Sequence, residues 1–474
     1  MSEQIPIKDV TPQVKIQQPD PSKSNGHSPR NRIYVRAVQG VYQRIRQRMG
    51  WLMMLLFLVL PWIPYGDRQG ILLDVVNQKF YLFGITLMPQ DFTLLAYLFI
   101  IAAFGLFFVT TFLGRVWCGY MCPQTVWTFI FIWFEEKFEG SANQRKKLDQ
   151  SPWDFNKIWR KGAKHASWLA FSLLTALTFV AYFLPAEEVF VGFFGGALSF
   201  APVFWVLFFA FCTYGNAGWM REIMCTHMCP YARFQSAMFD KDTFIVGYDV
   251  ARGEKRGPRG RKQDHKAMGL GDCIDCHLCV QVCPTGIDIR NGLQYECINC
   301  GACIDACDGV MDKMGYERGL IRYTTEHKLA GGHTHVVRPK LLGYGAIMVV
   351  MLGLFVYTLA TRSLAHMDIL RDRNALYREN VEGLIENSYT IKLLNKDVDS
   401  HVFVLDVEGL PAGWTWSGDR EVLVASGELA SLPITLVADP YELKRPITDI
   451  AFEAVAKDNA DIKVETDSRF FSKR

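Results

Sequence analysis

Eight of the 13 cysteines lie between residues 273 and 307, in two tetrads that share one spacing. The first tetrad is Cys273-x2-Cys276-x2-Cys279-x3-Cys283, and the second is Cys297-x2-Cys300-x2-Cys303-x3-Cys307. Cysteines spaced this closely are typical ligands of iron–sulfur clusters or of zinc, because both bind thiolates. Two zinc sites would use the C-x2-C pairs, but they would need neither the third cysteine nor the proline that follows Cys283. The spacing therefore favours iron–sulfur clusters and a chain that transfers electrons.

This spacing is typical of bacterial two-cluster ferredoxins, in which the fourth cysteine of each tetrad ligates the other cluster. We therefore predict one [4Fe–4S] cluster on Cys273, Cys276, Cys279 and Cys307. We predict the second cluster on Cys297, Cys300, Cys303 and Cys283. The chain departs from the pattern in one place, since Asp308 rather than proline follows the second tetrad, but this change leaves the ligands intact.

Four further cysteines form a repeated motif, Cys118-x3-Cys122-Pro and Cys225-x3-Cys229-Pro, with an arginine just upstream of each copy. Both copies follow a long apolar run, which indicates an internal duplication. C-x3-C places two thiols on one face of a helical turn, and the proline suits the start of a helix. Four such thiols could hold a soft metal ion, with Met121, Met224, His227 and Met228 as further candidate ligands. The alternative is that these small side chains only pack at helix ends.

For other residues that could bind metal or nucleic acid, we expect structural roles instead. Cys212 lies alone inside an apolar run, and we expect it to be a core residue. His333 and His335 are expected in a loop at the membrane interface rather than as metal ligands. The basic run 252–262 is expected to be a linker against anionic lipid and not a nucleic-acid site.

Five apolar runs predict an α-helical membrane domain with five spans, at about 49–65, 92–113, 166–185, 197–218 and 341–361. The first run is short and contains Pro61 and Pro64, so its length alone does not establish a span. Lys and Arg are frequent in residues 1–50 and 135–165 and scarce in 66–90 and 186–196. The positive-inside rule then places residues 1–50, 114–165 and 219–340 in the cytoplasm, which requires the first run to cross.

These boundaries predict a disordered cytoplasmic tail (1–35), a membrane domain (36–240) and an inserted ferredoxin-like α+β module (241–330). The fifth span (341–361) leads to residues 370–474, whose short alternating runs and turn signals predict an all-β immunoglobulin-like sandwich on the outer side. No signal peptide is visible, so the first span should be a retained anchor. The aromatic segment 126–138, which ends in acidic residues, is too short to span and is expected to be a membrane-surface helix.

The chain closely resembles the cytochrome c oxidase accessory proteins known as CcoG, FixG or RdxA, from about residue 35 onward. The most specific stretches are Trp117-Cys-Gly-Tyr-Met-Cys-Pro-Gln124, Pro284-Thr-Gly-Ile-Asp-Ile-Arg-Asn-Gly292, Gly319-Leu-Ile-Arg-Tyr323 and Arg371-Asp-Arg-Asn374. The resemblance implies a protein of the bacterial inner membrane with a cytoplasmic dicluster ferredoxin and a periplasmic immunoglobulin-like domain. It also implies a role in maturing a high-affinity, cbb-type cytochrome c oxidase, by reducing Cu(II) to Cu(I) for insertion.

In this interpretation Cys118, Cys122, Cys225 and Cys229 are the catalytic and copper-binding residues. The expected partners are the lipid bilayer, oxidase subunits or copper chaperones, and a cytoplasmic electron donor; no nucleotide-binding motif identifies that donor. Two alternatives remain open from the sequence. One is a quinol or ferredoxin oxidoreductase of the NapH type, and the other is a non-enzymatic scaffold for oxidase assembly.

Overall fold

The computed structural model describes residues 33–472 except for 67, 262, 373–374, 398, 411 and 444. The chain forms two units, one with residues up to Trp62 and Leu98–Leu352, the other with Ile63–Tyr97 and Gly353 to the C-terminus. Most of the predicted disordered tail (residues 1–32), Lys262 of the basic run and residues 373–374 of the last family stretch lie outside the described residues.

Among the described residues, three helices are long and apolar enough to cross a membrane: α2 (Phe92–Leu113), the helix Phe200–Met220 and α14 (Pro339–Ala360). The second of these begins as α8 (Phe200–Gly215) and ends in a π-helical turn. α2 and α14 lie side by side, and the rings of Phe104 and Phe107 pack against Tyr344. Their other faces remain exposed, as expected of helices that contact lipid.

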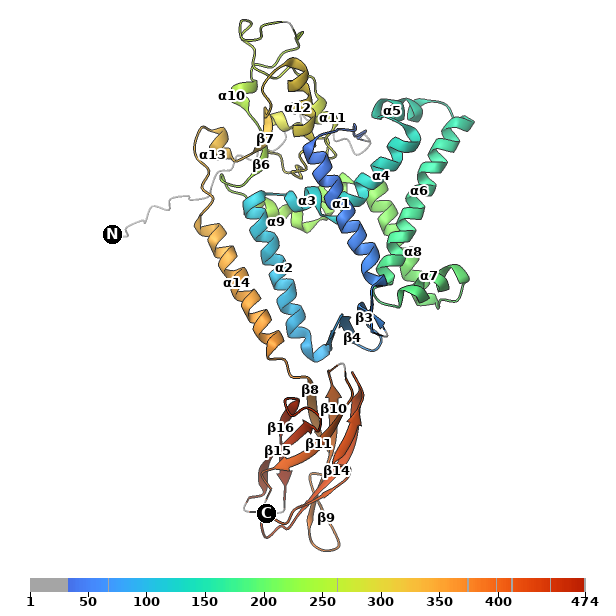
Figure 1. Cartoon of the computed structure of the whole chain (residues 1–474), viewed down its shortest axis with the longest axis vertical. Coiled ribbons are helices and arrows are strands. Elements are labelled where there is room, and N and C mark those ends of the chain that lie inside the picture. The colour runs from blue at the N-terminus through green and yellow to red at the C-terminus, as the bar shows by residue number, and fades with distance from the viewer. Residues whose placement is uncertain are drawn as a thin grey trace, which may run out of the picture. The chain divides into compact units, whose positions relative to one another are not determined.

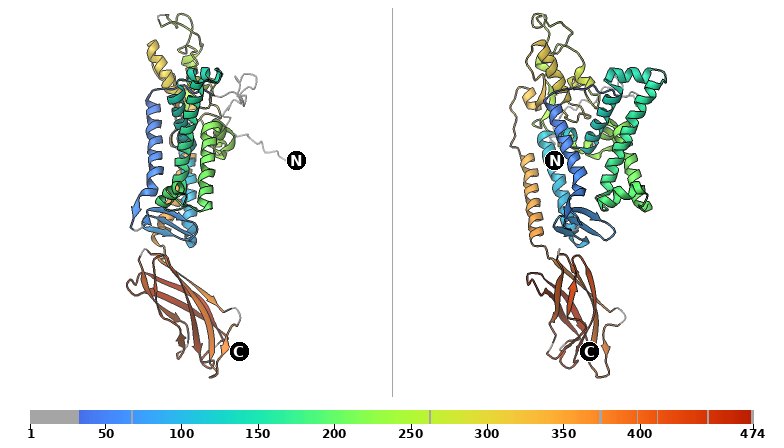
Figure 2. Two further views of the ribbon diagram at one scale, coloured as in Figure 1. Left: turned by 90° about the vertical axis from the view of Figure 1, so that its right-hand side faces the viewer. Right: turned by 45° about the vertical axis from the view of Figure 1, so that its right-hand side comes forward.

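The other two predicted spans are helices with different boundaries. α1 (Val41–Val59) begins in the basic segment and is followed by a 3₁₀ turn at Leu60–Trp62 and a strand at Pro64–Tyr65. The prediction of one span over 49–65 is therefore wrong at its end, because Pro61 cannot continue the helical hydrogen bonding. α6 (Phe155–Val180) begins well before the predicted residue 166. It packs along α8, to which α7 (Ala186–Gly195) connects it (Figure 2).

The ferredoxin-like module is α+β, as expected. Its strands β6 (Ile245–Tyr248) and β7 (Ile321–Thr324) pair antiparallel, with Ile245 opposite Thr324. Between them lie α10 (Val250–Gly253), α11 (Leu278–Gln281), a 3₁₀ turn (Ile289–Asn291) and α12 (Ala302–Met314). α13 (Glu326–Leu329) follows β7. β6, β7 and α12 lie near one another in the module (Figure 1). One apolar cluster joins both strands, α12 and three tetrad cysteines of the predicted first cluster.

The basic run, predicted to be a linker against anionic lipid, has two arginines that bind inside the module. Arg252 pairs with Asp272 at 2.5 Å and donates to the carbonyl oxygen of Arg318 at 3.0 Å. Arg259 donates to the carbonyl oxygen of Gly271 at 2.7 Å and lies over the ring of Tyr316. These two guanidinium groups are therefore structural donors inside the module, because carbonyl groups left free by its loops need partners.

The second unit contains the predicted β-sandwich. One sheet has the order β12-β14-β10-β8, with β9 beside β10, and the other has the order β13-β11-β15-β16. The strands are β8 (Ala365–Arg371), β9 (Arg378–Glu379), β10 (Ile385–Asn395), β11 (His401–Glu408), β12 (Thr415–Ser417), β13 (Glu421–Val424), β14 (Leu429–Ala438), β15 (Ile447–Ala456) and β16 (Lys463–Phe471). Alternate residues point inward, so that Phe403, Phe452 and Phe470 are fully buried between the sheets.

The second unit also includes the short strands that follow α1. β1 (Pro64–Tyr65) pairs with β2 (Arg68–Gln69), and β3 (Ile71–Asp74), β4 (Lys79–Leu82) and β5 (Ile85–Leu87) form an antiparallel sheet. A buried carboxylate joins this segment to the sandwich, since Asp91 pairs with Lys396 at 3.0 Å and with Arg362 at 3.2 Å. The segment before α2 and the residues around the sandwich therefore lie in direct contact.

Candidate functional site

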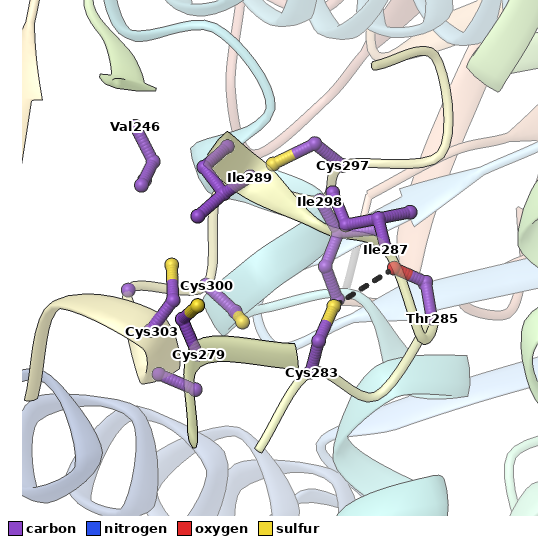
Figure 3. A pocket seen from close by; sticks show the side chains of 12 residues that line it. Val246, Cys279, Cys283, Thr285, Ile287, Ile289, Cys297, Ile298, Cys300 and Cys303 are labelled. Carbon is purple, nitrogen blue, oxygen red and sulfur yellow. Dashed lines mark hydrogen bonds between the residues drawn. The ribbon is translucent and has the colours of Figure 1, made fainter. Parts of the chain in front are cut away.

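Two neighbouring cavities in the ferredoxin-like module are lined by the tetrad cysteines. The first is lined by Cys283, Cys297, Cys300 and Cys303 and also by Cys279 (Figure 3). The second is lined by Cys273, Cys276, Cys279 and Cys307, so Cys279 lines both. The structure thus groups each fourth cysteine with the other tetrad, which is the division that the crossover pattern predicts.

Both tetrads use the same backbone turn around their second cysteine. The residues before and after that cysteine have positive φ: Asp275 (53°), His277 (55°), Asn299 (52°) and Gly301 (71°). Glycine, asparagine and aspartate adopt this left-handed region most readily. Two such turns in succession curl each loop around its cavity, so that consecutive cysteines point inward.

Burial holds these thiols in the protonated form unless a cation is present. Burial, together with the neighbouring cysteines, raises the pKa of Cys279, Cys297 and Cys307 to about 12. A bound metal reverses this preference, because its positive charge favours the thiolate. Cysteine sulfurs grouped around an apolar cavity fit an iron–sulfur cluster, which would be held by the cysteines of each cavity.

Arg290 is a residue of this site that the cysteine spacing does not reveal. Its side chain, 3% exposed, lines the second cavity and pairs with Asp275 at 2.5 Å and Asp288 at 2.6 Å. It therefore connects the first tetrad's loop to the segment that follows Pro284, and it places a buried positive charge beside Cys279. Its position inside the specific stretch 284–292 was the only signal for it in the sequence.

The C-x3-C-P motifs lie at matching helix junctions. α3 (Val116–Tyr120) carries Cys118, and Pro123 begins α4 (Pro123–Glu139). A π-helical turn (Met224–Met228) carries Cys225, and Pro230 begins α9 (Pro230–Met238). Cys122 and Cys229 occupy the residue just before each proline-led helix, so the predicted helix starts are found in both copies.

The structure brings the two motifs together. Burial, together with the nearby thiols of Cys122 and Cys229, raises the pKa of both Cys118 and Cys225 to about 12. Arg115 partly offsets this effect at both thiols. We call these four residues (Cys118, Cys122, Cys225 and Cys229) the cysteine quartet. The two motifs are far apart in the sequence, and the duplication accounts for their proximity in the structure.

The quartet is wider than a single-metal site. Within the described residues, no three of its sulfurs lie within 4.8 Å of one another. Sulfurs that each lie ~2.3 Å from one ion cannot be more than ~4.6 Å from one another. In this arrangement, one ion is therefore coordinated by at most two thiols of the quartet. Of the predicted extra ligands, Met121 and Met224 are half-buried, whereas His227 and Met228 are exposed. Cys212 is half-buried in α8 rather than fully in the core.

α3 lies directly against the loop of the second tetrad. A Cβ atom on Gly119 would lie 2.7 Å from the carbonyl oxygen of Ile298 and 3.0 Å from the Cα of Cys300. Cys118 packs into the same apolar cluster as Ile298 and Cys300. Arg115 adds a hydrogen bond of 2.5 Å to the carbonyl oxygen of Tyr295. The cysteine quartet and the second tetrad are therefore in van der Waals contact through the α3 backbone.

Buried ion pairs support the second motif. Glu135 of α4 is 1% exposed and pairs with Arg145 at 2.6 Å and with Arg221 at 2.7 Å. Glu139 pairs with Lys164 at 2.9 Å. The prediction that segment 126–138 is a membrane-surface helix is thus wrong for its acidic end, which basic side chains from other segments neutralise inside the protein. Arg221, just upstream of Cys225, connects the second motif to α4.

Family models and curated proteins match this chain over most of its length. The matching models are a 4Fe–4S dicluster domain (residues 220–326), a 4Fe–4S binding domain (95–139) and the immunoglobulin-like fold at the C-terminus of FixG (355–473). The second of these ranges contains Cys118 and Cys122 but none of the tetrad cysteines.

The chain is 38% identical to the nitrogen fixation protein FixG of Rhizobium meliloti, over 81% of this chain and 80% of that protein. It is 37% identical to protein RdxA of Cereibacter sphaeroides (81% and 83% covered) and 36% identical to protein RdxB of the same organism (82% and 84%). These relatives and the dicluster domain identify an iron–sulfur oxidoreductase and a membrane protein. The chain belongs to the FixG/RdxA family.

Proposed function

We propose that this protein transfers electrons to copper, reducing Cu(II) to Cu(I) for the assembly of a cbb-type cytochrome c oxidase. The observation that carries the proposal is the contact of Gly119 with the backbone of Ile298 and Cys300, which joins the cysteine quartet to the second tetrad. Bound iron–sulfur clusters would supply one-electron redox chemistry at the two cavities. The cysteine quartet is then the place where the substrate ion receives its electron.

The quartet suits the reduced product better than the oxidised substrate. Thiolate and thioether ligands select Cu(I), whereas Cu(II) is typical of nitrogen and oxygen ligands. Two half-buried thiols of the quartet that lose their protons to solvent when copper binds would therefore favour the step Cu(II) + e⁻ → Cu(I). The high pKa of Cys118 and Cys225 means that the ion itself must displace those protons.

Contacts within each unit support a topology of five spans. Asp91, before α2, touches Lys396 and Arg362, after α14, so both lie on one side of a membrane. The chain between them then crosses an even number of times, and since α2, α8 and α14 are three crossings, we assign the fourth to α6.

α1 supplies the fifth crossing in this topology. The backbone N–H groups of Tyr42 and Gln43, at its start, donate to Asp305 of the ferredoxin-like module at 3.1 and 2.7 Å. The residues after α1 belong to the unit that contains the sandwich. With the positive-inside rule, the ferredoxin-like module is cytoplasmic and the sandwich is periplasmic, available to oxidase subunits or copper chaperones.

The test is the identity of the electron acceptor. Protein purified without oxygen and reduced with dithionite, freed of excess reductant, would be mixed with Cu(II), with a quinone or with buffer. Cluster absorbance would report the electrons lost, and a Cu(I)-specific chromophore would report the product. We expect one Cu(I) for each electron lost. Reoxidation by the quinone alone would instead indicate a NapH-type oxidoreductase, and reoxidation by neither would indicate an assembly scaffold.

A further inference from the structure

A second group of metal-binding side chains lies outside the cysteine sites. Ligand atoms of Asp242, His327 and His335 all lie within 4.8 Å of one another, and no other group of three or more His, Cys, Asp or Glu meets this criterion in the described parts of the chain. Asp242 is largely buried, with its side chain 13% exposed, while His327 and His335 are 38% and 69% exposed. The group is thus anchored at its carboxylate and open to solvent at its imidazoles.

The pairing of β6 with β7 creates this group from residues far apart in sequence. Ile245 at the start of β6 is opposite Thr324 at the end of β7, so residue 242 and the segment after β7 emerge at the same end of the sheet. The backbone N–H of His327 then donates to the carbonyl oxygen of Lys241 at 3.2 Å. These contacts hold α13 beside the residues that precede β6.

The loop after β7 folds back so that both histidines face one carboxylate. The hydroxyls of Thr325 and Thr334 are 2.7 Å apart, and the N–H of Gly332 donates to the carbonyl oxygen of His327 at 2.8 Å. The N–H of His335 donates to Oδ1 of Asp242 at 3.0 Å. The second histidine is therefore positioned by its backbone, and its largely exposed ring lies beside the carboxylate.

Both histidine rings approach the carboxylate of Asp242. Nδ1 of His327 lies 2.8 Å from Oδ1, and Nδ1 of His335 lies 3.7 Å from Oδ2. The neighbouring carboxylate of Asp240 is already paired with Arg338 at 2.7 Å.

We propose that Asp242, His327 and His335 form a binding site for a divalent first-row transition-metal ion. Two imidazole nitrogens and one carboxylate oxygen suit Cu(II), Zn(II) or Fe(II), in contrast to the soft thiols of the cysteine quartet. The choice of Cu(II) among these ions rests on the proposed function, whereas the existence of the site does not. In the proposed function, this site would hold Cu(II) before its reduction.

The position of the site agrees with such a role. Phe244, two residues after Asp242, donates from its N–H to the carbonyl oxygen of Phe112 at the end of α2, at 2.9 Å. Its own carbonyl oxygen accepts from the side chain of Asn299 at 3.5 Å, and Asn299 lies between Cys297 and Cys300. The proposed metal site therefore lies one short segment away from the loop of the second tetrad.

The test is Cu(II) binding to the oxidised full-length protein in which the cysteine quartet is changed to serine, so that thiols do not compete. Affinity would be measured by competition with a chelator, and electron paramagnetic resonance would report nitrogen ligands. We expect one bound ion with imidazole nitrogens. His327→Ala and His335→Ala should each weaken binding by about 10-fold or more and simplify the nitrogen pattern, since even partners of metal ligands change affinity by about 10–100-fold.

His333→Ala is the matched control, because His333 is an exposed histidine of the same loop that the structure does not group with Asp242. It should leave both affinity and spectrum unchanged. Equal binding by the parent protein and by a His327→Ala/His335→Ala double variant would overturn the proposal, and so would an equal loss with His333→Ala. The quartet variant is the parent here, so this result is independent of whether the quartet reduces copper.

Discussion

Gly119→Ala is a precise perturbation of the contact between the cysteine quartet and the second tetrad. The added methyl group would lie 2.7 Å from the carbonyl oxygen of Ile298, and 3.0 and 3.1 Å from the Cα and N of Cys300. All three are backbone atoms, which cannot rotate away as a flexible side chain could. Overpacking of this kind costs about 1–3 kcal/mol, so we expect α3 to be displaced from the tetrad loop.

The size of the effect follows from that energy. A penalty of about 1–3 kcal/mol lowers the ratio of closed to displaced contact by roughly 5–150-fold. The rate at which Cu(II) reoxidises the dithionite-reduced protein should fall by up to that factor. Iron and sulfide content should stay at the wild-type level, because the substitution lies outside both cavities.

Gly309→Ala provides the matched control. Gly309 lies within α12, and a Cβ atom there would have no neighbour within 4 Å. Alanine stabilises a helix interior by roughly 0.5–1 kcal/mol relative to glycine, so the reoxidation rate should be unchanged. A Gly119→Ala protein that is reoxidised at the wild-type rate would refute this account of the contact, and an equal loss in both variants would attribute the effect to something else.

Three further predictions test the clusters, the ion pairs and the topology. Cys283→Ala should remove the electron paramagnetic resonance signal of the cluster on the second tetrad; loss confined to the sister cluster would contradict the crossover. Glu135→Ala leaves two buried guanidinium groups unpaired, so we expect a loss of about 3–5 kcal/mol of stability in thermal unfolding. Glu421→Ala, which breaks an exposed pair, should cost less than about 1 kcal/mol, and similar losses would refute the buried network. A reporter fused after Arg474 should be active only if it works in the periplasm, and one near Lys266 only if it works in the cytoplasm; the opposite pattern would exclude five crossings.

Local patterns in the sequence predicted the features that depend on local chemistry. The division of the tetrad cysteines between two cavities follows from their spacing, because two or three residues between cysteines restrict the directions in which the thiols can point. The helix starts at Pro123 and Pro230 follow from the fixed backbone of proline. The strands of the sandwich were also predictable from local sequence, because the alternation of buried and exposed side chains is visible within a single strand.

Features that depend on distant partners were missed. From the local sequence, the acidic end of α4 is expected at the surface. In the folded chain, Arg145 and Arg221 from other segments pair with Glu135 there. From the sequence, His335 is expected to be a loop residue. The pairing of β6 with β7, which more than seventy residues separate in the chain, brings it close to Asp242. Hydropathy describes composition along the chain, whereas these sites are made by contacts between segments that are far apart in it.

The central claim is that electrons leave this protein through the cysteine quartet to copper. The most direct measurement is the reoxidation of the dithionite-reduced protein by Cu(II) after Cys118, Cys122, Cys225 and Cys229 are changed to serine, with Cys212→Ser as the control. The quadruple variant should keep wild-type iron and sulfide but no longer produce Cu(I), whereas the control should match the wild type. Undiminished Cu(I) production by a quadruple variant that retains both clusters would contradict the account.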